Sequence, residues 1–342
     1  MFSKQNDNDA PFFIAEVGQN HQGELDIAIE YIKTFSSAGA NAIKFQTRDN
    51  KYLFSSDAYD AKYDSENAFH TTYGMHREKL ELKPEWLPIL KDECSKNNVF
   101  FMSTPFDEPS LNLLINNNVD ILKIASFDIG NLPFIDKIAQ TKLPVVISVG
   151  GGKIDQIISS IDCILNHHSD IAILHCVSEY PCEYNRLGLS SIKTLIKNFP
   201  NLTVGSSDHF SGILSGPIAY LQGARVFEKH VTLNRSWKGS DHSFALEFEG
   251  FRKFVRDTSR TKDMLTPKPI TDIGQEAVFK KLGKSIVAFE DLKSGQILQL
   301  HHLSGKIFKE QYIPVRESNN ILGKKIKKDI KKGMPLNYDD FI

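Results

Sequence analysis

Eight short apolar runs recur along the first three-quarters of the sequence, each bounded by turn-forming residues. Such runs indicate buried β-strands, and we expect strands at Phe12–Val17, Ala42–Thr47, Val99–Ser103, Ile121–Ser126, Pro144–Val149, Ala172–Val177, Leu202–Ser206 and Arg225–His230. Amphipathic stretches, which indicate helices, lie between most of them, at Leu25–Ser37, Pro109–Asn116, Leu132–Gln140, Ile154–Leu165, Leu189–Asn198 and Ile213–Leu221.

Apolar strands that alternate with helices are typical of a parallel sheet covered by helices on its faces. Eight such units within about 250 residues predict an α/β fold, a closed (β/α)8 TIM barrel over residues 1–260. An open doubly wound sheet is the alternative. It is disfavoured because no Gly-x-Gly-x-x-Gly motif follows the first strand.

Two segments depart from this alternation. The connection from Asp49 to Pro84 is long, and its aromatic residues favour a rim or lid of the site over a disordered surface loop. Residues 261–283 begin with the stretch Thr261–Thr271, which holds two prolines, and we expect them to form a linker.

The tail, residues 284–342, contains a short internal repeat. Asp291-Leu-Lys-Ser-Gly295 is followed later by Asp329-Ile-Lys-Lys-Gly333, and an apolar stretch precedes each copy. This pattern predicts a small, mostly β domain with approximate internal symmetry. Basic residues outnumber acidic ones in the tail, which indicates either a solvated face or an anionic ligand nearby.

The composition is that of an ordinary globular protein, with 41% hydrophobic and 24% charged residues among 342. The formal net charge is -1, so we expect neither nucleic acid nor a membrane as a partner. The polar start, Met1–Asp9, does not resemble a signal peptide. The four cysteines show no Cys-x-x-Cys spacing, so a reduced, cytoplasmic location is expected.

Two histidines follow apolar runs near the end of the barrel region. His209 ends Ser207-Asp-His209 and His230 ends Glu228-Lys-His230, a separation that fits one strand–helix–strand unit. The carboxyl ends of neighbouring parallel strands meet at one end of a barrel. Two imidazoles presented there form half of a divalent-metal site. The alternative is that they are two unrelated polar strand ends.

Two lysines, Lys44 and Lys123, interrupt otherwise apolar strands. An inward lysine is costly unless it is paired, so both indicate an anion site. Hydroxyl and carboxylate residues end the other strands and join them at the barrel mouth, where TIM-barrel active sites form. These further candidates are Glu16, Gln46, Thr104, Ser126, Asp128, Ser148, Tyr180 and Ser207.

Seven motifs along the chain resemble those of the sialic acid synthase family, in the same order and spacing. They are Ile14-Ala-Glu-Val-Gly-Gln-Asn-His-Gln-Gly23, Lys44-Phe-Gln-Thr47, Ser103-Thr-Pro-Phe106, Lys123-Ile-Ala-Ser126, Ser207-Asp-His209, Glu228-Lys-His230 and Gly239-Ser-Asp-His242. The resemblance covers nearly the whole chain, because residues 284–342 are similar to the family's antifreeze-like (SAF) C-terminal domain.

The resemblance implies an enzyme that condenses phosphoenolpyruvate with an N-acylated aldose, giving a nonulosonic acid and phosphate. It implies that His209 and His230 hold a divalent metal, Mn²⁺ or Mg²⁺, and that Glu16 and Asp128 are acid–base residues. It assigns phosphoenolpyruvate to Lys44, Thr104, Lys123, Ser126, Ser148 and Ser207, and the sugar to Gln46, Tyr180 and Asp241. It also implies a homodimer in which each tail is exchanged onto the partner's barrel.

Two positions depart from the family pattern. Asp128 stands where the family usually has a glutamate, and Ile307 stands where many relatives have an arginine that contacts the N-acyl group. The pattern Thr72–Arg77 favours N-acetylmannosamine or its 6-phosphate over dideoxy sugars. Two alternatives stay open: another phosphoenolpyruvate–aldose condensing enzyme, and a non-catalytic barrel that binds a sugar.

Overall fold

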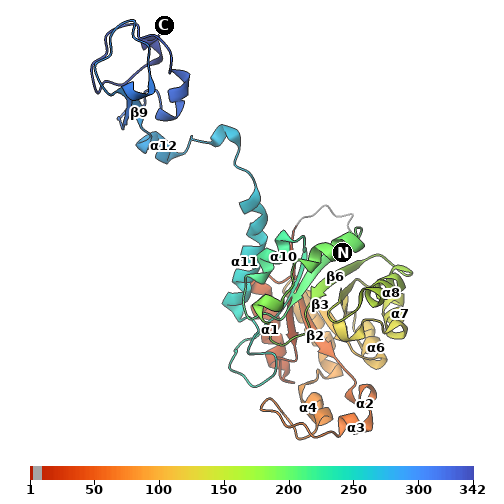
Figure 1. The fold of residues 1–342 in the computed structure, drawn as a ribbon. Coiled ribbons are helices and arrows are strands. Elements are labelled where there is room, and N and C mark those ends of the chain that lie inside the picture. The colour runs from red at the N-terminus through yellow and green to blue at the C-terminus, as the bar shows by residue number, and fades with distance from the viewer. Residues whose placement is uncertain (3–9) are drawn as a thin grey trace. The chain divides into compact units, whose positions relative to one another are not determined.

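The computed structural model describes residues 1–2 and 10–342. Most of the polar start that we compared with a signal peptide, residues 3–9, lies outside the described residues. The chain divides into two compact units, Met1–Met264 and Leu265–Ile342 (Figure 1).

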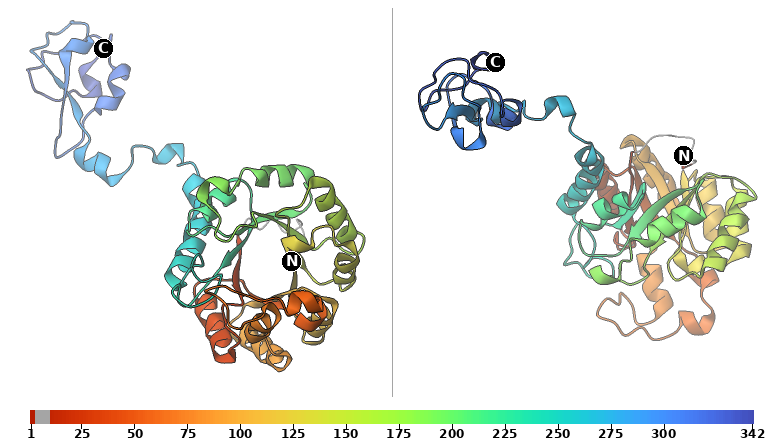
Figure 2. Two further views of the ribbon diagram at one scale, coloured as in Figure 1. Left: turned by 60° about the horizontal axis from the view of Figure 1, so that its bottom comes forward. Right: turned by 45° about the horizontal axis from the view of Figure 1, so that its top comes forward.

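The first unit is a closed barrel of eight parallel strands with helices around it, so the predicted TIM barrel is confirmed (Figure 2). Each strand pairs with the next along the chain, and β8 closes the barrel onto β1. The strands are β1 (Phe12–Gly18), β2 (Ala42–Thr47), β3 (Phe100–Pro105), β4 (Ile121–Ile124), β5 (Val145–Ser148), β6 (Ile171–Cys176), β7 (Thr203–Asp208) and β8 (Val226–His230).

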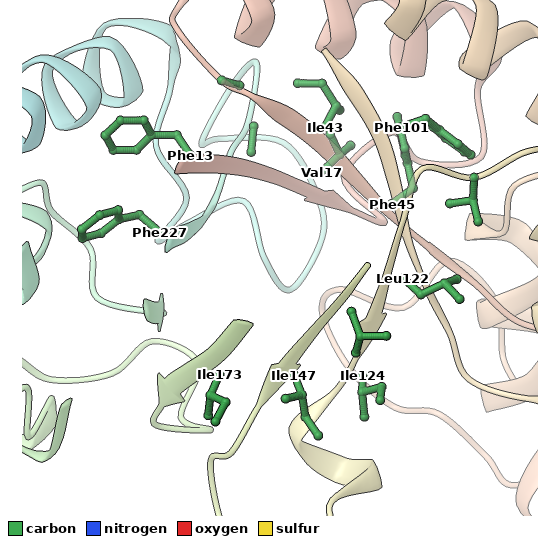
Figure 3. Packing of buried hydrophobic residues seen from close by; sticks show 14 of the residues in the cluster. Phe13, Val17, Ile43, Phe45, Phe101, Leu122, Ile124, Ile147, Ile173 and Phe227 are labelled. Carbon is green, nitrogen blue, oxygen red and sulfur yellow. The ribbon is translucent and has the colours of Figure 1, made fainter. Parts of the chain in front are cut away.

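Side chains alternate between the two faces of each strand, as the pleat requires. On β1, Phe13 and Val17 face the helices and join the large core between strands and helices, which Figure 3 shows. Ile14 and Glu16 lie on the other face, and Ile14 belongs to a second apolar cluster with Phe2. The barrel interior is therefore apolar as far as Ile14, and the next inward position on β1, Glu16, is polar.

The outer layer consists of eight helices: α1 (Leu25–Ser37), α5 (Leu87–Lys96), α6 (Glu108–Asn116), α7 (Leu132–Gln140), α8 (Ile154–Leu165), α9 (Ser191–Asn198), α10 (Ser215–Leu221) and α11 (Phe248–Leu265). Helix α6 begins with a side-chain cap, in which the Asp107 carboxylate accepts from the backbone N–H of Ser110. Among these and the other helices of the described residues, none is both long and apolar enough to cross a membrane.

The connection after β2 is ordered rather than a structureless loop, so that alternative was wrong. It forms α2 (Asn50–Leu53), α3 (Ser56–Tyr59) and α4 (Tyr73–Leu80). Aromatic rings hold the segment together, with Tyr73 in edge contact with both Phe54 and Tyr63. The ring of Tyr59 packs so close to Gly74 that a Cβ there would approach it to 2.2 Å.

The second unit contains the short helix α12 (Ala277–Leu282) and an antiparallel pair, β9 (Ser285–Ala288) and β10 (Leu303–Lys306). The internal repeat has a structural counterpart. The Asp291 carboxylate accepts from the backbone N–H of Lys332, and the Asp329 carboxylate accepts in the same way from Ser294. Helix α11 continues to Leu265, so part of the stretch expected to be a linker is helical.

Candidate active site

A cavity of about 330 Å³ opens at the carboxyl ends of the barrel strands. All the predicted site residues except Asp128 line it: Glu16, Lys44, Gln46, Thr104, Lys123, Ser126, Ser148, Tyr180, Ser207, His209, His230 and Asp241. The strand pleat explains much of this convergence, because the members that lie on strands occupy the inward positions just above the apolar floor. The others come from the segments that follow β4, β6, β7 and β8: Ser126, Tyr180, His209 and Asp241. Glu16 pairs in register with Lys44 on one side and with His230 on the other.

A buried network of two lysines and two carboxylates forms the floor of the cavity. The Lys44 Nζ lies 2.8 Å from Glu16 Oε2 and 3.6 Å from Glu228 Oε1. Lys123 Nζ donates to Ser148 Oγ at 2.7 Å, and Ser207 Oγ donates to Glu228 Oε1 at 3.0 Å. The lysines and the hydroxyl residues of this network were each predicted as site residues, but the contacts that join them through Glu228 were not predicted.

The network shifts the pKa values of its members in different directions. Burial would raise the pKa of Glu228, but Lys123 and Lys44 lower it to about 2. Burial and the nearby Glu228 carboxylate raise the pKa of Glu16 against the effect of Lys44. Burial lowers the pKa of Lys123. Glu228 is thus a fixed negative charge, whereas Glu16 is suited to exchanging a proton.

His209 and His230 lie together at the wall, with ring centroids 5.3 Å apart. His209 Nδ1 donates to the carbonyl oxygen of Val177 at 2.7 Å, which leaves the Nε2 lone pair free. Burial, followed by the neighbouring His230, lowers the pKa of His209 to about 4, so the ring is neutral. His230 Nδ1 is buried without a hydrogen-bond partner. Neutral imidazoles with free nitrogens fit a divalent metal.

Tyr180 and Asp241 adjoin the histidines. The Tyr180 ring centroid lies 4.0 Å from that of His209, and Asp241 Oδ2 lies 3.8 Å from His230 Nδ1. On β2, which neighbours β1 on the side away from β8, Gln46 Nε2 donates to Glu16 Oε1 at 2.8 Å. These three predicted sugar-contacting residues line one continuous cavity with the histidines.

Besides Glu228, four polar residues line the cavity and were not predicted as site residues: Gln19, Arg48, Arg77 and Ser240. Arg48 lies two residues after Gln46, just as Gln46 lies two residues after Lys44. The two-residue period of a strand could therefore have predicted that Arg48 faces the cavity. Arg48 Nη2 donates to Gln46 Oε1 at 2.6 Å. Arg77 comes from α4 in the insertion, where no strand period applies.

Asp128 is not among the cavity-lining residues. Strand β4 ends at Ile124, earlier than predicted, and residues Ser126–Asp128 form a single 3-10 turn. The Asp128 carboxylate accepts from Asn131 Nδ2 at 2.9 Å, and burial raises its pKa. Ser126 does reach the cavity, where its hydroxyl lies 2.9 Å from that of Ser178. An acid–base role for Asp128 stays a prediction.

Another group of metal-ligand types occurs in the second unit, where donor atoms of Glu290, His301 and His302 lie within 4.8 Å of one another. His302 Nδ1 accepts from the backbone N–H of Gln299 at 2.9 Å. Its proton is therefore on Nε2, the nitrogen that faces Glu290 at 3.7 Å. A protonated nitrogen cannot ligate a metal, so this group fits an ion less well than the barrel histidines do.

Comparison with known proteins agrees with the geometry. N-acetylneuraminate-9-phosphate synthase of Drosophila melanogaster is 33% identical over 96% of this chain and 95% of its own length. N,N'-diacetyllegionaminic acid synthase of Legionella pneumophila is 32% identical over 96% of this chain and 94% of its own.

A solved structure extends the comparison to three dimensions. The crystal structure of N-acetylneuraminic acid synthetase from Leptospira borgpetersenii serovar Hardjo-bovis matches with a TM-score of 0.69 at 31% identity, covering 78% of this chain and 90% of that one. The family profile described as the NeuB family matches residues 31–268, more than half of the sequence. The resemblance found in the motifs is thereby confirmed: the chain belongs to the NeuB family.

Proposed function

We propose that this protein condenses phosphoenolpyruvate with an N-acylated aldose to form a nonulosonic acid, with release of phosphate. The observation that carries the proposal is one cavity that joins a lysine-based anion site to two neutral histidines with free nitrogens. The relatives named as synthases of N-acetylneuraminate 9-phosphate, diacetyllegionaminic acid and pseudaminic acid support the same reaction class.

Phosphoenolpyruvate, a trianion at most, would bind over the lysine network. Lys123 holds its ammonium beside the Ser148 hydroxyl, and Lys44 lies 3.4 Å from Thr104 Oγ1. Lysines with neighbouring hydroxyls suit phosphate and carboxylate oxygens. Ser126 and Ser207 would add hydroxyl donors from the next strands. Glu228 neutralises part of the charge of the two lysines, so their burial at the cavity floor is tolerated when the ligand is absent.

A divalent ion, Mn²⁺ or Mg²⁺, is the proposed cofactor, held by His209 and His230. Such an ion, when bound, polarises a carbonyl oxygen as a Lewis acid. The chain's own residues then have three tasks: they hold the two substrates in contact, exclude water and move protons. Gln46, Tyr180 and Asp241 would orient the sugar so that its aldehyde faces carbon 3 of phosphoenolpyruvate.

Glu16 is the proposed proton-transfer group. Carbon 3 of the enol attacks the aldehyde carbon, so a carbon–carbon bond forms, the aldehyde oxygen becomes a hydroxyl by taking up a proton, and positive charge develops at carbon 2. Water adds at carbon 2 and passes one proton to a carboxylate. The bond from carbon 2 to the phosphate oxygen then breaks as the remaining hydroxyl proton leaves, which gives the 2-keto group and phosphate. The raised pKa of Glu16 makes it a better proton acceptor than Glu228, whose pKa is lowered.

The experiment is phosphate release from phosphoenolpyruvate with Mn²⁺ and N-acetylmannosamine or its 6-phosphate, with mass spectrometry of the product. Lys123→Met should abolish release, whereas Lys193→Met, which removes an exposed lysine on α9, should not. Retained turnover in Lys123→Met would sink the assignment. An eight-carbon product from an unacylated pentose would favour the other condensing reaction, and sugar binding without phosphate release would favour the non-catalytic barrel.

We also propose the exchanged homodimer that the family resemblance implies, in which the second unit of each chain packs against the partner's barrel. Ile307 is 53% exposed within that unit. An exposed apolar residue at this position fits a role at a contact better than a role in the unit's own core. Sedimentation of the whole chain, compared with residues 1–264 alone, measures whether the second unit is required for association.

A further inference from the structure

A buried ion pair closes the base of the insertion that follows β2. Arg48 directly precedes the insertion, and Glu81 follows its last helix, α4. Their side chains are 8% and 9% exposed, and Arg48 Nη1 lies 3.8 Å from Glu81 Oε2. Glu81 Oε1 also accepts from the backbone N–H of Arg48 at 3.1 Å. Glu81 thus contacts both the backbone and the side chain of Arg48.

Two further contacts hold the Arg48 guanidinium in place. It lies over the ring of Phe106, with its Cζ atom 3.9 Å from the ring centroid. Its Nη2 donates to Gln46 Oε1 at 2.6 Å. A planar guanidinium held by a carboxylate, a ring and an amide has few orientations open to it. Arg48 is therefore a rigid donor at the wall of the main cavity, which Phe106 also lines.

Gln46 transmits this constraint to Glu16. A guanidinium can only donate hydrogen bonds, so the amide oxygen of Gln46 faces Arg48 and the amide nitrogen is left for Glu16. Gln46 Nε2 donates to Glu16 Oε1 at 2.8 Å, and Lys44 Nζ lies 2.8 Å from Glu16 Oε2. The Glu16 carboxylate is thus held at both oxygens, and Arg48 directs one of the two contacts.

The backbone beside Glu16 leaves room for this contact. Strand β1 shifts register between Glu16 and Gly18, and Gly18 has a φ of 56°. A Cβ at Gly18 would lie 3.2 Å from Gln46 Nε2 and 3.3 Å from Glu16 Oε1. A side chain there would press on both partners of the hydrogen bond, and the left-handed φ favours glycine in any case. The local fold therefore accommodates the contact between Gln46 and Glu16.

Closing the insertion would explain the ion pair but not the other contacts. Burial lowers the pKa of Arg48 to about 10, opposed by Glu81. Burial raises the pKa of Glu81 to about 7, opposed by Arg48. Because burial disfavours both charged forms, an apolar pair would close the insertion as well. The bond from Arg48 to Gln46 does not help to close the insertion, since Gln46 lies on β2.

We propose that Arg48 is a positioning residue: through Gln46 it holds the Glu16 carboxylate in the orientation for proton transfer, and Glu81 holds Arg48 in place. The proposal rests on the function proposed above and adds to it a residue that acts on the chemical step without touching the reacting atoms. It also gives the insertion a second task besides forming the rim, because opening its base would release Gln46 and, with it, Glu16.

The test measures kcat and KM in Arg48→Met, Gln46→Leu and the double variant. Arg260→Met is the control, because Arg260 is exposed on α11. We expect kcat to fall by about 10- to 100-fold in Arg48→Met, with the KM for phosphoenolpyruvate within about threefold of wild type. The double variant should have the kcat of Gln46→Leu within about twofold, because Arg48 acts through Gln46. Arg260→Met should match wild type.

Two kinetic results would overturn the proposal. Losses of kcat that add in the double variant would show that Arg48 acts independently of Gln46. A raised KM for phosphoenolpyruvate with kcat unchanged in Arg48→Met would show that Arg48 binds that substrate directly. If Arg48→Met does not fold, Glu81→Ala replaces it, with the exposed Glu85→Ala as its control. Glu81→Ala should lower kcat less than Arg48→Met, because Phe106 and Gln46 still hold the guanidinium, and an unchanged kcat would then overturn the proposal.

Crystal structures of wild type and Arg48→Met separate this proposal from the function itself. We expect Glu16 and Gln46 to move beyond hydrogen-bond distance in Arg48→Met and to stay in contact in Arg260→Met. If wild type turns over no sugar but the contact is lost in Arg48→Met, the function fails and the positioning role stands. An unchanged contact between Glu16 and Gln46 in Arg48→Met would overturn the positioning role, whatever the turnover.

Discussion

Lys229 and Asp208, which directly precede the two proposed metal ligands in the sequence, form an ion pair. Lys229 is 1% exposed, and its Nζ lies 2.7 Å from Asp208 Oδ2. The ammonium also donates to the carbonyl oxygen of Phe210, and Asp208 accepts from the Phe210 N–H at 2.7 Å and from the Ser215 hydroxyl. The pair therefore fixes the turn that carries His209, and its loss should affect both stability and metal binding.

The contacts set the size of each effect. Lys229→Met keeps the length of the side chain and leaves Asp208 with two donors, so we expect a loss of about 3 kcal/mol, the lower end for a broken buried pair. Asp208→Asn leaves a buried ammonium poorly paired and should cost about 4 to 5 kcal/mol. The double variant should cost less than the sum of the two by about 2 kcal/mol.

A matched control is the pair between Lys91 and Asp120, whose side chains are 25% and 26% exposed. Solvent screens this pair, so Lys91→Met should cost less than about 1 kcal/mol. Urea unfolding followed by tryptophan fluorescence suits the comparison, because both tryptophans, Trp86 and Trp237, lie in the barrel unit. A cost for Lys229→Met no greater than that for Lys91→Met would refute the reasoning.

Three further outcomes follow from the site. His209→Ala should abolish Mn²⁺ binding, measured by electron paramagnetic resonance, while the barrel stays folded; unaltered binding would reject His209 as a ligand. Because burial lowers the pKa of Lys123, phosphoenolpyruvate binding at alkaline pH should take up a proton, seen by calorimetry in two buffers; no uptake would contradict this. Burial raises the pKa of Glu81 from 4.5 to about 7, so the folded state loses stability as pH rises through that interval. Glu81→Gln should remove that loss, on the order of 3 kcal/mol; equal pH dependence in both proteins would contradict it.

The barrel and most of its site were predictable because one physical rule governs both. Strand residues alternate in direction, so a polar residue two positions beyond an inward apolar one must face the cavity, as Glu16 does beyond Ile14. The same rule extends to Arg48 after Gln46. It failed at Asp128, because β4 ends at Ile124 and the chain turns before that residue.

The insertion after β2 was the least predictable part of the barrel unit. Helix α4 has no apolar stripe, since its partners are the aromatic rings of the same segment, such as Phe54 and Tyr63 against Tyr73. Periodicity therefore could not place Arg77 at the cavity. The continuation of α11 to Leu265 was also unforeseen, because residues beyond 260 show no strong period in the sequence.

The most direct test of the central claim is the product formed from phosphoenolpyruvate and an N-acylated hexosamine in the presence of Mn²⁺. The account predicts one phosphate released for each nine-carbon 2-keto acid formed, identified by mass spectrometry, with both lost after chelation of the metal. Phosphate release that does not depend on the sugar, or no release with phosphoenolpyruvate bound at Lys123, would contradict it.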